Sequence, residues 1–383
     1  MKLNKYKLGE LVEVTRGASL SGQFYAEEGE LIRLTLGNFN MNGGGFKENT
    51  SKTDLYYTGT VKDEFILNKG DIITPLTEQS LGLLGTTARI PESGKYIQSQ
   101  DVALVKCKEG LLDPNFCYYL ISSSVVRQQL SAGAQQTKIR HTSPDKIKDC
   151  TVWMPDLEEQ KRIGRILIDI DEKITLNRQI NDNLEEQLRL ITSHYIFCSP
   201  NLEKKRIGDI AMVKAGGDCP IIFSKTRTQE CNIPIFSNGT ENRGLYGFTD
   251  KAAIEERSIT VAARGTIGYC ERRLKPFVPI IRLLAITPKD EGAYIYLHQV
   301  IKGMKFKKNG SVQQQLTVPE ISFIEIPYPN SSVLSEYNKL ANPIVEMIER
   351  NISENESLTK QRDELLPLLM NGQASVNYHL SAD

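Results

Sequence analysis

Residues 158–197 read EEQKRIGRILIDIDEKITLNRQINDNLEEQLRLITSHYIF, a stretch without proline and with a single glycine at position 164. Apolar or amide residues recur in it at alternating steps of four and three, which is the a/d spacing of a helix that packs on another helix. These positions are Ile163, Leu167, Ile170, Ile174, Asn177, Asn181, Leu184 and Leu188, followed by Ile191 and Tyr195. The spacing predicts one helix of roughly 40 residues and about 60 Å, and a helix of this length needs a partner.

A matching seam lies near the C-terminus, and both seams carry two asparagines at equivalent positions. Its members are Tyr337, Ala341, Ile344, Ile348, Asn351, Asn355 and Leu358, followed by Arg362, Leu365 and Leu369. Unpaired amides on an apolar seam cost stability, so we expect asparagine to face asparagine. An antiparallel pair would place Asn181 opposite Asn351 and Asn177 opposite Asn355, but a parallel pair would match the asparagines equally well. The alternative is two unrelated surface helices, which the shared asparagine spacing disfavours.

The composition is that of a folded protein with two or three domains. The chain has 383 residues, with 47 Lys+Arg balanced by 47 Asp+Glu. No stretch approaches 18 consecutive apolar residues, and the start MKLNKYKLGE lacks the apolar core of a signal peptide, so we expect a cytoplasmic protein. Seven cysteines without a C-x-x-C pair argue against a disulfide framework and against a zinc site.

The segments before the two long helices resemble each other. The sequence YKLGEL at 6–11 is echoed by KRIGDI at 205–210, and SAGAQQ at 131–136 by NGSVQQ at 309–314. We therefore expect four parts, with globular domains at 1–152 and 200–326 and long helices within 153–199 and 327–383. Short β-type runs at 31–36, 71–74, 101–107, 233–236, 258–262 and 280–286, with helical stretches at 115–130 and 293–302, predict α+β domains with a small bent sheet.

Motifs for catalysis are missing from the sequence. It contains no phosphate-binding glycine loop, no H-E-x-x-H and no nucleophile elbow, and its four histidines have no ligand-like spacing. We therefore expect no catalytic residue, no metal site and no cofactor in this chain.

Basic and amide residues on loops recur in both copies and are candidates for nucleic-acid contact. Thr86 and Arg89 follow a predicted strand, as Arg264 and Thr266 do in the second copy. A second matched group contains Gln135, Gln136, Lys138 and Arg140 in the first copy, and Lys307, Lys308, Gln313 and Gln314 in the second. Arginine and glutamine reach base edges bidentately, and lysine suits phosphate. Each loop taken singly could be an ordinary solvated surface, but the recurrence favours nucleic acid.

Two motifs resemble those of type I restriction-modification specificity subunits. The sequence MPDLEEQKRI at 154–163 resembles the family's L-P-P-L-x-E-Q-x-x-I opening of the central conserved helix. The sequence RDELLPLLMNGQ at 362–373 resembles its R-D-x-L-L-P-x-L-x-S-G-x ending. The resemblance covers nearly the full chain, although NSSVLSEY at 330–337 lacks the E-Q pair at the start of the second helix.

The resemblance implies both a fold and a function. The fold would be two target-recognition domains of mixed α/β structure separated by two long antiparallel coiled-coil helices, with a pseudo-twofold internal repeat. Each domain would read one half of a bipartite, asymmetric double-stranded DNA target, and the chain itself would be non-catalytic. Two methyltransferase subunits with S-adenosylmethionine would methylate adenine N6, and endonuclease/translocase subunits with ATP and Mg would cleave; no membrane partner is implied. The alternatives are a coiled-coil scaffold that joins two protein-binding domains, and a fused restriction and methylation enzyme, for which the chain has no room.

Overall fold

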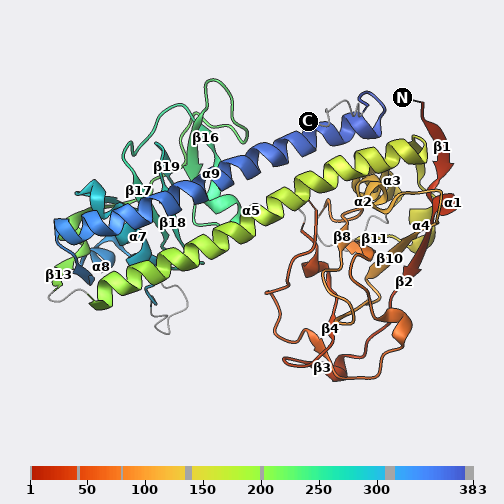
Figure 1. Ribbon diagram of the computed structural model, residues 1–383, viewed down its shortest axis with the longest axis horizontal. Coiled ribbons are helices and arrows are strands. Elements are labelled where there is room, and N and C mark those ends of the chain that lie inside the picture. The colour runs from red at the N-terminus through yellow and green to blue at the C-terminus, as the bar shows by residue number, and fades with distance from the viewer. Residues whose placement is uncertain are drawn as a thin grey trace, which may run out of the picture. The chain divides into compact units, whose positions relative to one another are not determined.

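The computed structural model describes residues 2–40, 44–78, 81–133, 140–198, 202–306 and 315–375. The chain forms two compact units. The first comprises Met1–Leu176 and Ser353–Asp383, and the second comprises Asn177–Ile352. Each unit therefore contains a globular domain and a part of each of two long helices (Figure 1).

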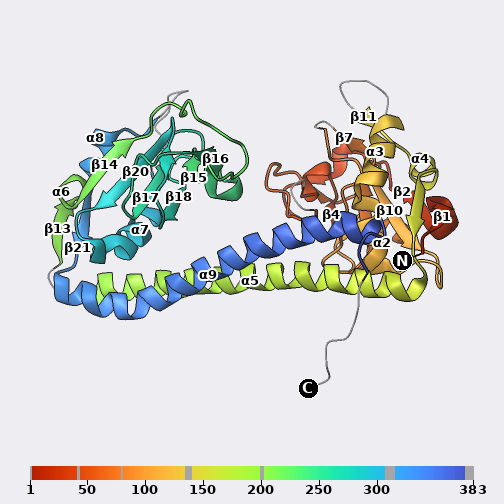
Figure 2. The ribbon, with the colours of Figure 1, turned by 90° about the horizontal axis from the view of Figure 1, so that it is seen from above.

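The two long helices are α5 (Leu157–Cys198) and α9 (Ser331–Met370), and they lie side by side in both views (Figures 1 and 2). In the second unit, the amide of Asn181 pairs with that of Asn351, and the hydroxyl of Thr192 pairs with that of Tyr337. Residue numbers thus rise along α5 as they fall along α9.

Contacts in the first unit give the same direction. Arg362 of α9 binds Asp171 of α5 at 2.7 Å, and Glu354 of α9 lies 3.7 Å from Lys173 of α5. The helices are antiparallel, which confirms the direction that the family resemblance implied and excludes a parallel pair.

The residues of the heptad seams face inward. All the predicted seam positions are buried or half-buried in their units: Ile163, Leu167, Ile170, Ile174, Asn177, Asn181, Leu184 and Leu188 on α5, and Ile344, Ile348, Asn351, Asn355 and Leu358 on α9. The positions between them are mostly exposed, as expected of a narrow a/d stripe.

The globular part of the first unit is built from short strands and four short helices within the described residues. Its strands are β1 (Asn4–Lys7), β2 (Val12–Arg16), β3 (Tyr25–Ala26), β4 (Ile32–Arg33), β5 (Tyr56–Tyr57), β6 (Ile72–Pro75), β7 (Thr77–Glu78), β8 (Ala88–Arg89), β9 (Tyr96–Ile97), β10 (Val102–Cys107), β11 (Arg140–His141) and β12 (Thr151–Met154). Its helices are α1 (Leu8–Leu11), α2 (Pro114–Ser122), α3 (Ser124–Gly133) and α4 (Pro144–Lys148).

The globular part of the second unit repeats this plan in a shorter form. Its strands are β13 (Glu203–Arg206), β14 (Ala211–Ala215), β15 (Ile233–Phe236), β16 (Leu245–Thr249), β17 (Ser258–Ala262), β18 (Cys270–Arg273), β19 (Val278–Pro279), β20 (Leu283–Pro288) and β21 (Glu325–Tyr328). Its helices are α6 (Ile207–Ile210), α7 (Tyr294–Lys302) and α8 (Val318–Ser322).

The sheet order shows the internal repeat directly. The antiparallel sheet β2-β10-β6-β8 of the first unit corresponds to β14-β20-β17-β18 of the second, and the pair β1-β12 corresponds to β13-β21. A smaller outer sheet in each unit contains one parallel pair, β4 with β9 and β15 with β19. The predicted mixed α/β fold with an internal repeat is therefore confirmed.

Two glycines occupy equivalent places in the two units: Gly17 follows β2, and Gly216 follows β14. A Cβ on Gly17 would lie 2.2 Å from the carbonyl oxygen of Gln98, and a Cβ on Gly216 would lie 2.3 Å from that of Ile280. At both positions the chain has just left β2 or β14, the edge strand of the four-stranded sheet. It then passes so close to the backbone of the outer sheet that no side chain would fit. The glycine at this place therefore allows the two sheets of each unit to approach each other closely.

The start of α5 is fastened to its domain by the residues of the E-Q motif. Gln160 is buried; its amide oxygen accepts from the backbone N–H of Asp113 at 3.1 Å, and its Nε2 donates to the carbonyl of Pro155 at 3.0 Å. In the second unit, the seam offset places Leu334 at the position of Gln160, and Leu334 is buried in the core. The departure from the motif thus replaces a polar contact with an apolar one at the same place.

Each unit has its main core between the four-stranded sheet and the long helices. In the first unit Phe116 and Ile121 of α2 pack with Ile163 of α5. In the second, Tyr296 of α7 packs with Tyr337 of α9. Burial of these large apolar side chains stabilises each unit.

The structure differs from the predicted elements at three points. The helix expected at 115–130 is two helices, because Ser123 adopts extended backbone between them. The strand expected at 31–36 is limited to β4, because the following residues turn at 36–38. The strand expected at 280–286 begins later and ends later, as β20, because residues 283–288 are those that pair with β14 and β17.

Candidate nucleic-acid interface

The loop at 263–269, between β17 and β18, carries the predicted contact residues Arg264 and Thr266. Gly265 has a φ of +76°, a conformation that turns the chain sharply and favours glycine. Asn238, from the loop after β15, fastens this turn: its Nδ2 donates to the carbonyl of Arg264 at 2.8 Å, and its own carbonyl accepts from the hydroxyl of Thr266 at 2.8 Å. The backbone of the loop is therefore held by the neighbouring loop.

The side chain of Arg264 is available to a ligand. It is half-buried, and within the described ranges its guanidinium has no hydrogen-bond or ion-pair partner. Thr266 beside it is exposed. A planar cation of this kind binds phosphate, or a guanine edge bidentately.

Of the corresponding residues predicted in the first unit, Thr86 is buried and Arg89 is half-buried. Thr86 is fully buried, and its hydroxyl accepts from the guanidinium of Arg127 at 2.8 Å. Arg89 donates to the side chain of Asn115 at 2.7 Å and lies 5.2 Å from the ring centre of Tyr118. The burial of Thr86 contradicts its assignment as a DNA contact, and the guanidinium of Arg89 is engaged with α2.

Strand register shows that the sequence comparison matched Arg89 with the wrong residue of the second unit. Arg89 pairs with Ile72, and Arg272 pairs with Ile259, in hairpins that occupy the same place in the two sheets. The counterpart of Arg89 is therefore Arg272 and not Arg264. The sequence match was wrong because the loops that precede the two arginines differ in length.

Arg140 anchors a loop of the first unit. It forms an ion pair with Glu78 at 3.0 Å, and the side chain of Glu78 is only 2% exposed. The other carboxylate oxygen of Glu78 accepts the backbone N–H groups of Gly82, Leu83 and Leu84 at 3.0–3.1 Å. Because a buried carboxylate needs all of these partners, Glu78 and Arg140 fix the turn that precedes β8.

The remaining predicted contacts lie outside the described residues. They are Gln135, Gln136, Lys138, Lys307, Lys308, Gln313 and Gln314. Their contact with DNA stays a prediction.

A cluster of aromatic rings and a cation on the second unit was not predicted from the sequence. The rings of Phe223 and Tyr246 have centres 5.5 Å apart, and the ammonium of Lys225 lies 3.9 Å from the centre of the Tyr246 ring. Ile221 and Ile222 beside them are exposed. The exposed ammonium of Lys225 beside these rings is suited to phosphate contact.

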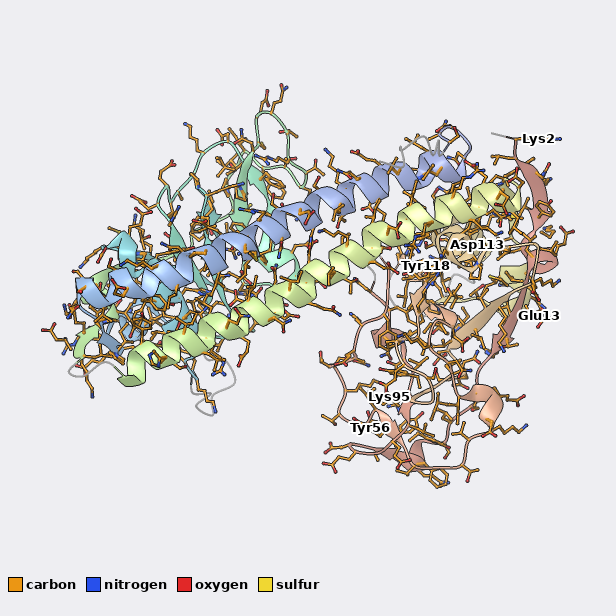
Figure 3. The ribbon with its side chains drawn as sticks, in the orientation of Figure 1. Lys2, Glu13, Tyr56, Lys95, Asp113 and Tyr118 are labelled. Atoms are coloured by element: carbon orange, nitrogen blue, oxygen red, sulfur yellow. The ribbon has the colours of Figure 1, made fainter. Side chains whose placement is uncertain are left out.

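The first unit also has aromatic rings and a cation on its outer sheet, but here the cation, Arg33, is buried and paired with Asp54 at 3.1 Å. Phe24 and Tyr57 meet edge to face at 5.8 Å, and the guanidinium of Arg33 lies 3.7 Å from the ring centre of Tyr25. Figure 3 shows Tyr56 on this sheet, well away from Tyr118 on α2. The signal in the sequence was the equal spacing of Gly17 from Phe24 and of Gly216 from Phe223.

A buried ion-pair network fastens the second domain to α5. Arg272 is 4% exposed; it pairs with Glu185 of α5, to which Lys302 of α7 also binds at 2.8 Å. Burial by itself raises the pKa of Glu185, but the charges of Arg272 and Lys302 outweigh burial and lower this pKa to about 2. Burial and the nearby cations hold the pKa of His298 well below its ordinary value, which leaves its Nδ1 free to accept from Arg272 at 3.3 Å.

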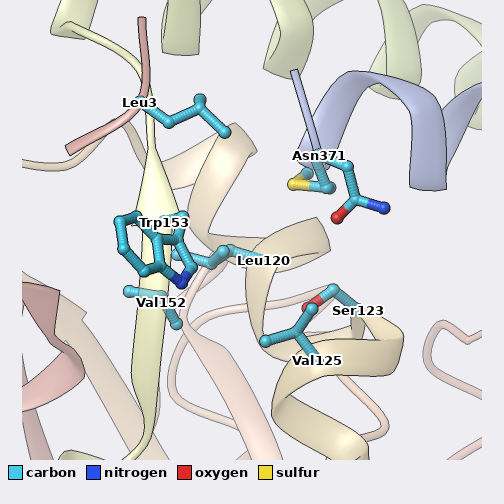
Figure 4. A pocket seen from close by; sticks show the side chains of 8 residues that line it. Leu3, Leu120, Ser123, Val125, Val152, Trp153 and Asn371 are labelled. Atoms are coloured by element: carbon cyan, nitrogen blue, oxygen red, sulfur yellow. The ribbon is translucent and has the colours of Figure 1, made fainter. Parts of the chain in front are cut away.

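Two cavities open in the first unit between α2, α3 and the end of α9. The smaller, of about 160 Å³, is lined by Leu3, Leu120, Val125, Trp153 and Asn371, among others (Figure 4). The larger, of about 360 Å³, includes Arg127 and Arg362 in its lining. Within the described residues, no group of three or more His, Cys, Asp or Glu side chains could hold a metal ion, and no helix is long and apolar enough to cross a membrane.

Comparison with known families identifies the repeat. The family model described as the type I restriction modification DNA specificity domain matches residues 2–186 and again residues 200–366. The chain belongs to this family. It is a type I restriction-modification specificity subunit with two such domains, which confirms the resemblance seen in the sequence.

Relatives of similar length carry the same family name. A Mycoplasma pneumoniae protein provisionally named a type I specificity subunit is 24% identical over 362 residues, which cover 90% of each chain. The specificity subunit of the type I restriction enzyme HindI of Haemophilus influenzae is 22% identical, over 73% of this chain and 81% of the relative. The crystal structure of a type I restriction-modification S subunit from M. genitalium has the same fold, with a TM-score of 0.58, 21% identity and coverage of 96% of each chain.

Proposed function

We propose that each domain of this specificity subunit reads one half of a bipartite, asymmetric double-stranded DNA target. The observation that carries this proposal is the repeated framework, in which two domains with the same sheet order are attached to one antiparallel helix pair. The two copies differ in their loops, so they are suited to two different half-sequences. In the second unit, Arg264 and Thr266 are the described residues best placed for contact.

We infer that the chain directs partner subunits and does not catalyse. Two methyltransferase subunits, which would bind S-adenosylmethionine and flip out the target adenine, are the proposed partners for adenine-N6 methylation. Endonuclease/translocase subunits with ATP and Mg are the proposed partners for cleavage. Such a complex would act on DNA in the cytoplasm.

Exchange of one domain tests whether each domain reads its own half of the target. Residues 1–155 should be replaced as a block by the matching part of another family member, because β12 pairs with β1 and must move with it. Methylated sites mapped by sequencing should then change in one half of the target and keep the other half. The reciprocal exchange of residues 202–329 is the control and should change only the other half. A change of both halves by either exchange would contradict the modular proposal.

Salt dependence separates this function from that of a protein scaffold. The affinity of the assembled complex for its target should fall steeply as salt is raised, because lysine and arginine side chains displace counterions from phosphates. A salt-independent affinity, or no affinity for DNA, would favour the scaffold.

A further inference from the structure

The loop that supports Arg264 contains a strained turn. In the loop at 237–244, between β15 and β16, Asn242 and Arg243 have φ of 46° and 55°, and Gly244 follows with φ +79°. Three consecutive residues in the left-handed region are unfavourable, and two of them carry side chains. Such a conformation persists only where the surroundings hold it in place.

The side chain of Arg243 makes the contacts that keep this turn in place. Its Nη1 and Nη2 donate to the two carboxylate oxygens of Glu349 on α9 at 3.2 Å each, and its Nε donates to Glu271 of β18 at 2.7 Å. The backbone carbonyl of Arg243 accepts from the guanidinium of Arg273 at 2.6 Å. A bidentate pair of this kind fixes direction as well as distance.

This contact is charged and partly sheltered from water. The side chain of Arg243 is 27% exposed and that of Glu349 is 19% exposed. Burial alone would lower the pKa of Arg243, but the carboxylates of Glu271 and Glu349 outweigh it and raise this pKa. Arg243 therefore stays charged at neutral pH.

The other end of the same loop reaches the proposed DNA contacts. The N–H of Ser237 donates to the carbonyl of Gly244 at 2.8 Å, which closes the loop at its base. Asn238 then binds the backbone of Arg264 and the hydroxyl of Thr266. A continuous set of contacts thus leads from Glu349 on α9 to the turn that carries Arg264.

In the first unit, a different set of contacts attaches the globular domain to the long helices. There Tyr119 of α2 donates to Asp171 of α5 at 2.6 Å, and Asp171 also binds Arg362 of α9. These contacts involve α2, whereas Arg243 belongs to the loop that supports the proposed contact residues.

We propose that Arg243 is a positioning residue for target reading by the second unit, and that its pair with Glu349 fixes the turn of Arg264 relative to α9. The proposal rests on the proposed function and goes beyond it, because it assigns selectivity at one half of the target to residues that do not touch DNA.

The test compares variants in the complete complex with its methyltransferase. Arg243→Asn removes the guanidinium, while asparagine tolerates the left-handed backbone. Glu349→Gln weakens the same pair from the other side and keeps an acceptor for Arg243, and it also weakens the 3.7 Å contact of Glu349 with Arg272. Arg257→Ala is the matched control, because Arg257 forms an exposed pair with Glu291 at 3.6 Å in the same unit.

The measured quantity is discrimination, the ratio of affinities for the cognate target and for targets with one base changed. We expect Arg243→Asn to lose about tenfold in discrimination at the half read by the second unit and nothing at the other half. Glu349→Gln should lose less, and Arg257→Ala should match the wild type. Arg243→Lys, which keeps one charge, should recover part of the loss.

Thermal unfolding of each variant separates positioning from folding. If Arg243→Asn unfolds, Glu349→Gln and Arg243→Lys carry the test. Folded variants that discriminate as the wild type does, or that lose both halves equally, would overturn this proposal alone. A wild-type complex that reads no bipartite target would overturn the proposed function as well.

Discussion

The side-chain amide of Asn351 donates a hydrogen bond to the amide oxygen of Asn181 at 2.8 Å, between α9 and α5 of the second unit. Asn181 in turn donates to the backbone carbonyl of Ile348 at 3.3 Å. Two of the polar side chains on a mostly apolar seam thus pair with each other. Such a pair favours one register of the helices, because a shifted register would leave both amides without partners.

Leucine substitutions measure what this pair contributes. Asn181→Leu alone should lower the free energy of unfolding by about 1–3 kcal/mol, because the amide of Asn351 then lacks its acceptor. The double variant Asn181→Leu/Asn351→Leu should recover most of this loss and accept targets with an altered gap more readily, because only Asn177 and Asn355 then remain to mark the register. Urea unfolding and methylation of targets with different gaps are the measurements. Asn183→Leu, exposed on the same helix, is the control. Equal stability of the single and double variants would contradict the role of the pair.

Adjacent glycines provide a matched test of the crossing between the two sheets. A Cβ on Gly216 would lie 2.3 Å from the carbonyl oxygen of Ile280, whereas a Cβ on Gly217 would meet no atom within 4 Å. Gly216→Ala should therefore lower the free energy of unfolding by about 1–3 kcal/mol or more. Gly217→Ala should change it by no more than about 1 kcal/mol in either direction. Similar losses in the two variants would show that the crossing is not the cause.

The ion pair of Glu185 predicts a dependence of stability on pH. The pKa of Glu185 is lowered from 4.5 to about 2 in the folded protein, so the unfolded chain takes up the proton first as the pH falls. The stabilisation is therefore complete above about pH 4.5 and is lost as the pH falls toward 2. It is on the order of 3 kcal/mol at neutral pH.

Urea unfolding at pH 7 and pH 3.5 tests this dependence. The wild type should exceed Glu185→Gln in stability by a margin that is smaller at pH 3.5 than at pH 7. Glu186→Gln is the control, because Glu186 is an exposed neighbour paired with Arg189, and surface pairs contribute little. A margin that is the same at both pH values would exclude the pair as its source.

Two substitutions of Arg264 distinguish base contact from phosphate contact. Arg264→Ala should weaken binding to the cognate target by about 1–3 kcal/mol if the guanidinium binds a base edge bidentately. Arg264→Lys would restore a phosphate contact but not a bidentate base contact, because lysine presents a point charge. Affinity measured on cognate and base-changed targets separates the two cases. Normal affinity of Arg264→Ala would remove this residue from the interface.

Local patterns in the sequence predicted the framework of the fold well. The strands Ile233–Phe236 and Ser258–Ala262 begin and end where the runs of β-forming residues do. The helix pair followed from its heptad seam, because the spacing of apolar residues repeats along the whole length of both helices. These features depend on neighbours within a few positions of the chain.

The candidate site was predicted less well, because it depends on contacts between distant segments. The hydroxyl of Thr86 is taken up by Arg127, and Glu78 pairs with Arg140. Neither partner is adjacent in the chain, and the side chains of loops are placed by such contacts. Arg89 was matched with Arg264 instead of Arg272, because the two copies share their strands but differ in the lengths of their loops.

The central claim is that this chain gives a methyltransferase its bipartite target. Single-molecule methylome sequencing should compare cells that express the chain together with its methyltransferase with cells that express the methyltransferase alone. We expect a split, asymmetric methyladenine motif that is present only with the chain. A motif that persists without the chain, or no motif while the methyltransferase is shown to be active by another route, would contradict the claim.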